Sequence, residues 1–96
     1  MRKRARWMNK ATDPILETLQ SAKGLYLSRG DINYNIQRRP GDQPSKQTVY
    51  RAFDELTEYG LVDIEDDGTP RYGITDRGLG YLNGEVDASS IEKVEN

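Results

Sequence analysis

The sequence predicts an α+β fold on the winged helix-turn-helix plan: helix, short strand, helix, helix, two-stranded wing and C-terminal helix. Three observations support this prediction. Apolar residues recur at helical spacing in three separate stretches before residue 60. Two short β-rich runs follow, separated by the turn sequence DDGTP. The third helical stretch passes directly into these runs through Gly60, a residue that commonly ends helices.

The first two helices and the strand between them follow from local signals. The first helix is expected to begin at residues 12–14, where Thr and Asp offer cap oxygens before a proline that needs no N–H there. Lys23 and Gly24 are its expected stop. Residues 25–27, Leu-Tyr-Leu, are too short for a helix and are expected to pair with the later hairpin. Ser28 is the expected cap of the second helix.

The third helix follows a proline- and glycine-containing turn at residues 39–44. Its expected core face consists of Val49, Ala52, Phe53 and Leu56. Its opposite face is basic or neutral in the N-terminal half and acidic further on. A helix that enters a DNA groove with its N-terminus first is expected to show this gradient.

The fourth helix follows the hairpin and is expected to be capped by Thr75. Leu79 and Leu82 are expected to point inward. The presence of Gly78 and Gly80 in this helix can be interpreted in two ways. Either each glycine only weakens the helix, by roughly 1 kcal/mol relative to alanine, or it permits the close approach of a neighbouring segment.

The N-terminal half of the third helix supplies the main candidates for DNA binding. Glutamine can pair bidentately with adenine and arginine with guanine, whereas Lys, Tyr and Ser serve phosphates. The candidates are Ser45, Lys46, Gln47, Tyr50 and Arg51. An ordinary solvated helix face is the alternative interpretation, and the glycine and hairpin that follow the helix favour DNA binding.

Further candidates lie in a basic N-terminal arm and in the wing. The arm can enter a minor groove or follow phosphates, or it can be a solvated, disordered terminus. The wing has two acidic residues at its tip, Asp66 and Asp67, which DNA phosphates would repel, so deep insertion of the tip into the minor groove is not expected. Contacts between the side of the wing and the DNA backbone, and a purely structural role for the wing, both stay open. The candidates here are Arg2, Lys3, Arg4, Arg6, Thr69 and Arg71.

The net charge of −2 hides a strong asymmetry. Residues 1–60 carry 11 Lys and Arg against 7 Asp and Glu, while residues 61–96 carry 3 against 9. The local field is what steers a polyanion, so the basic part is expected to face double-stranded DNA and the acidic part to point away.

The chain divides into three parts: a basic arm at 1–10, a winged helix-turn-helix DNA-binding domain at 11–84, and a polar tail at 85–96. For the tail, helix and disorder both stay open. A homodimer is expected, because one recognition helix reads only a few base pairs. The apolar residues outside the central fold are interface candidates, with packing on their own chain as the alternative: Trp7, Met8, Tyr81, Leu82, Ile91 and Val94.

Composition argues against several classes of function. The chain has no His and no Cys, and therefore no imidazole base, thiolate nucleophile or His-ligated metal. No window approaches the roughly 20 apolar residues of a membrane span. Residues 63–68 resemble the start of a calcium loop, but Ile74 stands where the twelfth position needs Glu. We expect the protein not to be an enzyme and to bind no metal, cofactor or small-molecule ligand. The lack of Cys is consistent with a location in the reducing cytoplasm.

Three segments resemble a known family: RWMNKATDPILETL, GDINYNI, and the run from SKQTVYRAF to LNGEVDA. They are similar to the small haloarchaeal winged-helix regulators, the family of the phage phiH repressor. The most specific parts are the Trp7–Met8 pair and the run GLGYLNGE at residues 78–85. The resemblance implies a transcriptional regulator, often a repressor, that binds operator DNA through its third helix and wing. A winged-helix module that binds proteins is the alternative.

Overall fold

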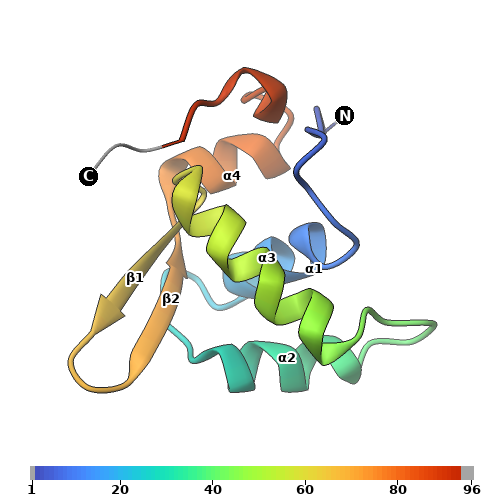
Figure 1. The fold of residues 1–96 in the computed structure, drawn as a ribbon, viewed down its shortest axis with the longest axis vertical. Helices are drawn as coiled ribbons and strands as arrows, with labels where there is room; N and C mark the ends of the chain where they lie inside the picture. The colour runs from blue at the N-terminus through green and yellow to red at the C-terminus, as the bar shows by residue number, and fades with distance from the viewer. Residues whose placement is uncertain (1, 94–96) are drawn as a thin grey trace.

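The computed structural model describes residues 2–93 and confirms the winged helix-turn-helix architecture (Figure 1). Three helices come first, then a hairpin and a fourth helix. A single turn of 3₁₀ helix follows near the C-terminus. The elements are α1 (Thr12–Ser21), α2 (Arg29–Gln37), α3 (Lys46–Glu58), β1 (Val62–Asp66), β2 (Pro70–Ile74), α4 (Asp76–Leu82) and η1 (Ala88–Ser90).

The predicted caps of the last three α-helices are confirmed. The hydroxyl of Ser28 accepts a hydrogen bond from the Asp31 N–H at 3.1 Å, and that of Ser45 accepts from the Thr48 N–H at 3.2 Å. Thr75 caps α4 in the same way. Each of these oxygens satisfies one of the N–H groups that a helix leaves unpaired in its first turn.

The start of α1 differs from the prediction. Its N-cap is Ala11, without a side-chain cap, and Thr12 is the first helical residue. The Thr12 hydroxyl instead accepts from the backbone N–H of Asn9 at 3.0 Å. The chain before α1 turns back on itself, so the threonine oxygen binds the preceding turn rather than the helix. The predicted stop is confirmed, since Lys23 and Gly24 both have positive φ, 55° and 87°.

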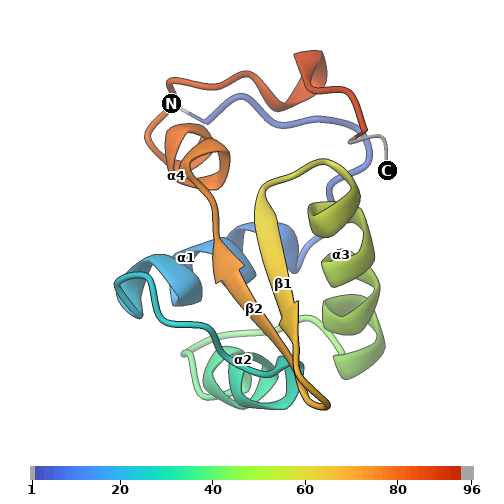
Figure 2. The same ribbon diagram turned by 90° about the vertical axis from the view of Figure 1, so that its left-hand side faces the viewer.

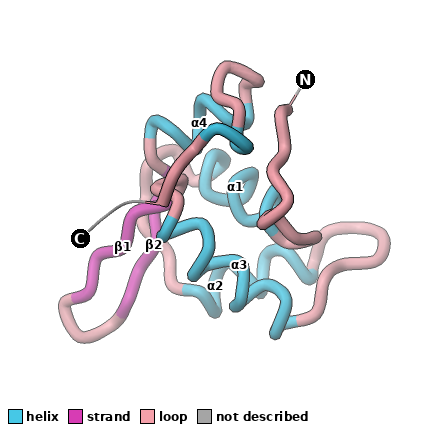
Figure 3. Tube along the Cα trace, turned by 45° about the horizontal axis from the view of Figure 1, so that its top comes forward, coloured by secondary structure: helices cyan, strands magenta, loops and turns pink. Residues whose placement is uncertain are grey.

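β1 and β2 form the antiparallel wing, with Ile64 opposite Tyr72. The short segment before α2 joins this hairpin as predicted: Leu27 and Tyr72 exchange two backbone hydrogen bonds, of 2.9 and 2.7 Å. Figure 3 shows the hairpin at one side of the molecule and the long loop between α2 and α3 at the other. The wing is therefore tied to the helical body by a third extended segment.

α1 lies at the centre of the fold, where it packs against α2, α3 and α4. The largest fully buried side chains are Tyr81 from α4 and Phe53 from α3. Leu82 points inward as predicted, but Leu79 is only half-buried. The close approach expected as one interpretation for Gly78 is present: a Cβ at this position would collide with the backbone carbonyl of Leu61.

The two ends of the described chain lie side by side on the fold (Figure 2). Lys3 and Asp87 form a parallel bridge, and the Ala88 N–H donates to the Lys3 carbonyl at 2.9 Å. Met8 and Ala88 belong to the core, with exposed fractions of 9% and 0%. Residues 2–10 and 85–93 therefore pack against the helical body.

Candidate nucleic-acid interface

The N-terminal half of α3 presents its predicted DNA-binding side chains to solvent. The predicted core face is confirmed, since four side chains are at most 2% exposed: Val49, Ala52, Phe53 and Leu56. On the opposite face Lys46, Gln47 and Arg51 are exposed. Within residues 2–93, none of these three forms an ion pair or a side-chain hydrogen bond. Their donors are free to bind a ligand.

Tyr50 is half-buried, and its ring contacts two cations. The guanidinium carbon of Arg29 is 4.7 Å from the centre of its ring, and the Lys46 ammonium is 5.3 Å from it. Such contacts hold a cation over the negative face of an aromatic ring. Sequence reasoning missed Arg29, whose only local signal is its place directly after the helix cap Ser28.

Ser45 has a structural role in the observed geometry. Its hydroxyl accepts from the Thr48 N–H and also lies 3.0 Å from the Thr48 hydroxyl. Both contacts are within the first turn of α3. The serine therefore fixes the start of the helix on which the neighbouring candidates stand.

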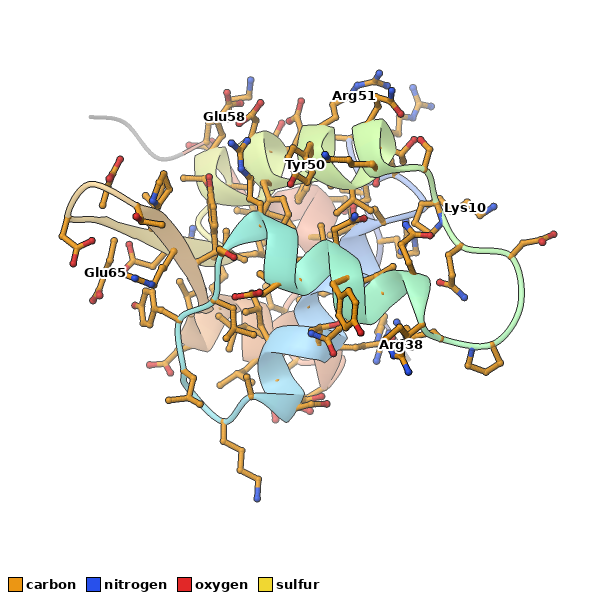
Figure 4. The ribbon with its side chains drawn as sticks, turned by 90° about the horizontal axis from the view of Figure 1, so that it is seen from below. Lys10, Arg38, Tyr50, Arg51, Glu58 and Glu65 are labelled. Carbon is orange, nitrogen blue, oxygen red and sulfur yellow. The ribbon has the colours of Figure 1, made fainter. Side chains whose placement is uncertain are left out.

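The C-terminal half of α3 is acidic and adjoins an acidic wing. Lys10, Arg38 and Arg51 lie toward one end of the molecule, and Glu58 and Glu65 toward the other (Figure 4). An open hollow of about 690 Å³ between α3 and β1 is lined in part by three carboxylates: Asp54, Glu58 and Asp63. Phosphates would be repelled from this end, so the charge gradient predicted for α3 extends across the face.

The wing candidates Thr69 and Arg71 lie beside the acidic tip. Arg71 forms an exposed ion pair with Asp67, with 3.3 Å between nitrogen and oxygen. The carboxylate of Asp66 accepts from the Gly68 N–H, which closes the turn. Exposed pairs of this kind contribute at most about 1 kcal/mol, so Arg71 remains able to change partners.

Two arginines of the N-terminal segment bind carboxylates of α1. Arg2 pairs with Asp13 and Glu17, and Arg4 pairs with Asp13 at 2.8 Å. Arg39, from the loop after α2, pairs with Glu17 at 2.7 Å. This network, Arg2–Arg4–Asp13–Glu17–Arg39, joins the N-terminal segment to α1 and to the loop after α2. The carboxylates of Asp13 and Glu17 compete with DNA phosphates for these arginines.

The remaining basic candidates of this segment, Lys3 and Arg6, are exposed. Lys3 lies near Asp87, whose pKa is lowered mainly by hydrogen bonds from Ser89 and to a smaller extent by the Lys3 charge. Arg6 forms no ion pair within the described part of the chain. The structure therefore distributes the basic segment over several surroundings and does not present it as one free arm.

Glu17 is held in its charged form by this network. Burial acts to raise its pKa, but hydrogen bonds from Arg2 and Arg39 outweigh burial, and the pKa lies below its ordinary value of 4.5. A lowered pKa in the folded state stabilises the fold above the unfolded-state pKa, and this contribution is lost as the pH falls through the folded-state pKa.

We therefore expect Glu17→Gln to lower the free energy of unfolding by roughly 1 kcal/mol near neutral pH. The difference from the wild type should shrink as the pH falls below about 4.5, where the wild-type carboxylate itself takes up a proton. Urea denaturation at several pH values measures both effects. Glu85→Gln, at an exposed position, is the control. A deficit that persists unchanged at pH 3 would show that the charge of Glu17 is not the cause.

Three dimer-interface candidates are unavailable to a second chain. Met8, Tyr81 and Leu82 are buried in their own core, with exposed fractions of 9%, 0% and 8%. The Tyr81 hydroxyl also donates to Asp13 at 2.8 Å, and burial together with this bond raises its pKa to about 12. For these residues the alternative interpretation, packing within the chain, is correct.

The other apolar candidates lie nearer the surface. Trp7 is half-buried and stacks on Tyr59 with ring centres 4.2 Å apart and an angle of 3° between the planes. Ile91 is half-buried and packs against the core. Val94 lies outside the described residues. Trp7 and Ile91 therefore retain surface that a second chain can cover.

Residues 2–93 contain no cluster of three or more acidic side chains placed to hold a metal ion. Within the same range no helix is long and apolar enough to cross a membrane.

Comparison with known proteins gives three consistent matches. The sequence model of the winged helix-turn-helix phage repressor family matches residues 1–94. The repressor protein of Halobacterium phage phiH is 34% identical over 94 residues, which cover 97% of this chain and 99% of that protein. The crystal structure of the PhiH1 repressor-like protein from Haloarcula marismortui superimposes with a TM-score of 0.74 and 31% identity, over 98% of both chains.

Proposed function

The chain belongs to the winged helix-turn-helix phage repressor family, and from this premise we propose that it represses transcription by occupying a specific operator in double-stranded DNA. A repressor of this kind works by occupancy, and occupancy requires no chemical step and no cofactor. It acts where the DNA is, which for this cysteine-free chain we take to be the cytoplasm.

One observation supports the proposal above the others: α3 is cationic and unpaired at the end that would enter a groove, and acidic at its other end. Lys46, Gln47 and Arg51 are exposed with free donors. Glu58 and the hollow beside β1 lie at the opposite end. An α-helix fits the B-DNA major groove, and its N-terminal residues are the ones that contact base edges.

The side chains then divide by chemistry. Gln47 and Arg51 can form bidentate hydrogen bonds with adenine and guanine, respectively. Lys46 carries a point charge suited to phosphate, and Tyr50 offers a hydroxyl while bracing two cations. The wing, with its acidic tip, mainly supports α3, and Arg71 and Thr69 reach the DNA backbone from its side.

We propose a homodimer on the DNA. Two recognition helices related by a twofold axis read a palindrome whose half-site centres lie about one helical turn apart. Trp7 and Ile91 are the candidates that keep exposed surface for such contacts. A homodimer would double the number of base contacts without any additional domain.

The alternative function, binding of another protein through α3, predicts a different residue composition for the exposed face of this helix. Protein interfaces are enriched in aromatic residues at their centre and depleted in lysine. Here Tyr50 is the one aromatic residue among the outward-facing side chains of the N-terminal half of α3, and Lys46 and Arg51 flank it. Tyr50 and Arg51 suit either partner, whereas the exposed Lys46 favours DNA.

Heparin chromatography separates the two functions. Heparin is a polyanion, so a DNA-binding face should retain the protein and release it late in a salt gradient. The charge-reduced variant Lys46→Gln/Arg51→Gln should elute earlier. Passage of the wild type without retention would support the protein-binding module.

A further inference from the structure

Lys10 directly follows Asn9, a residue that links the N-terminal segment to α3, and the guanidinium of Arg4 donates to the Asn9 carbonyl at 3.0 Å. The side-chain amide of Asn9 donates to the Thr48 carbonyl of α3 at 3.2 Å. The same residue is fixed to α1, because its side-chain oxygen accepts from the Ala11 N–H at 2.8 Å and its N–H donates to Thr12. Asn9 therefore holds the turn that carries Lys10 against the recognition helix.

Lys10 itself is free to act on a ligand. It is exposed, and within residues 2–93 it has no ion-pair partner. Arg2 and Arg4 differ, since both bind carboxylates of α1. In Figure 4 Lys10 lies with Arg51 toward the cationic end of the molecule, away from Glu58 and Glu65.

The face of α3 has two flanks with a cation beside each. At 100° per residue, Thr48 and Arg51 lie on one side of Gln47, and Lys46 and Tyr50 lie on the other. The first flank contacts Asn9, the residue that precedes Lys10 in the chain. The second flank faces α2, whose first residue, Arg29, lies over the Tyr50 ring at 4.7 Å. Gln47 thus stands between two cationic borders.

The major groove of B-DNA has matching geometry. It is about 12 Å wide, admits an α-helix, and is bordered by the phosphates of the two strands. A helix with Gln47 pointing at the base edges would place each flank toward a different strand. Phosphate contacts on both borders fix the register and tilt of a recognition helix without reading sequence.

We propose that Lys10 and Arg29 form a phosphate clamp, in which each residue binds the backbone of a different strand while α3 lies in the groove. This inference rests on the proposed DNA-binding function and adds two residues outside α3 to it. Asn9 is the positioning residue for Lys10, and Tyr50 is the positioning residue for Arg29. The sequence signals for this clamp are weak, because both links join residues that are distant along the chain.

The clamp is tested with Lys10→Gln and Arg29→Gln, which remove a charge but retain a long polar side chain. Lys23→Gln is the matched control, since Lys23 is exposed and belongs to the loop after α1, which lies on the opposite side of the molecule from α3 (Figure 2). The probe is the duplex that the wild-type protein enriches most strongly from a random pool. A cooperative thermal unfolding transition serves as the check that each variant is folded.

Each clamp variant should lower the slope of log K against log salt by about 0.9 for each bound subunit, the value for one phosphate contact, while Lys23→Gln leaves the slope unchanged. Within each half-site, phosphate-ethylation interference should lose one site on one strand in Lys10→Gln and one site on the other strand in Arg29→Gln. A wild-type slope in either variant, or lost sites on the same strand of a half-site, would overturn the clamp. If the wild type enriches no duplex, the proposed function itself fails.

A double-mutant cycle tests the positioning role of Asn9. In the Asn9→Ala background, Lys10→Gln should change the salt slope by less than half as much as in the wild type, because Lys10 is no longer held against α3. A purely structural asparagine would lower the unfolding temperature but leave the effect of Lys10→Gln on the slope intact. That second outcome would remove Asn9 from the clamp.

Discussion

Replacing Arg51 with alanine is expected to weaken operator binding by roughly 1–3 kcal/mol, which is about 5- to 150-fold in affinity. Arg51 is exposed and has no ion-pair partner within residues 2–93, so no intramolecular bond must break before it binds. Its five donors in a planar fork match the O6 and N7 acceptors of guanine. Competition titrations at moderate salt with the selected duplex measure the loss.

Arg51→Lys distinguishes base reading from charge. Lysine retains the positive charge but cannot form the rigid bidentate pair. If Arg51 reads a base, the lysine variant should lose most of the affinity that the alanine variant loses, and both should relax the preference at one operator position. If Arg51 binds only phosphate, lysine should restore affinity. Unchanged affinity in Arg51→Ala would exclude this residue from the interface.

Replacing Gly78 with alanine is expected to destabilise the protein by about 2 kcal/mol, within the range for overpacked cores. The added Cβ would collide with the Leu61 carbonyl and lie 2.8 Å from the Ile74 side chain. The carbonyl cannot move freely, because it accepts the Thr75 N–H at the start of α4. The intrinsic helix preference for alanine, about 1 kcal/mol, opposes the effect without cancelling it. For a domain of this size the melting temperature should fall by roughly 8–16 °C.

Gly80→Ala is the matched control for this prediction. Its Cβ would meet the Val86 side chain, which can rotate away, rather than backbone. We expect little change or a small loss in this variant. Equal unfolding temperatures for Gly78→Ala and the wild type would show that the contact between α4 and the segment before β1 is looser than the structure indicates.

The elements of the fold that could be predicted are those set by neighbouring residues. Ser28, Ser45 and Thr75 cap their helices because a short oxygen-bearing side chain precedes a helical stretch. The apolar period of α3 fixes its core face, and with it the exposure of Lys46 and Arg51. The turn residues of DDGTP predict the hairpin, and the shortness of residues 25–27 predicts an extended segment that pairs with it.

Contacts between distant residues could not be predicted. The sequence contains no sign that Arg2 binds Glu17, that Lys3 pairs with Asp87, or that Asn9 binds α3. The basic segment therefore looked like a free arm, although two of its arginines have partners on α1. Tyr81 was a candidate for a dimer interface, with packing on its own chain as the alternative, and the packing of α1 against α4 buries it completely.

The capping of α1 shows the same limit at short range. Thr12 has a side-chain hydroxyl of the kind that caps helices, but this hydroxyl accepts its hydrogen bond from the Asn9 N–H in the preceding turn. Arg29 illustrates the opposite case, in which a residue gains a candidate role solely because α2 places it over Tyr50. The interface candidates on α3 were accessible to sequence reasoning since they share one helix. The candidates outside α3 required the fold.

The central claim, sequence-specific DNA binding by the N-terminal half of α3, is tested most directly by selection from a random pool of double-stranded DNA. The account predicts enrichment of a palindromic consensus with half-site centres about 10 base pairs apart, and a changed consensus for the Gln47→Ala/Arg51→Ala variant. Failure of the wild-type protein to enrich any sequence above the starting pool would contradict it.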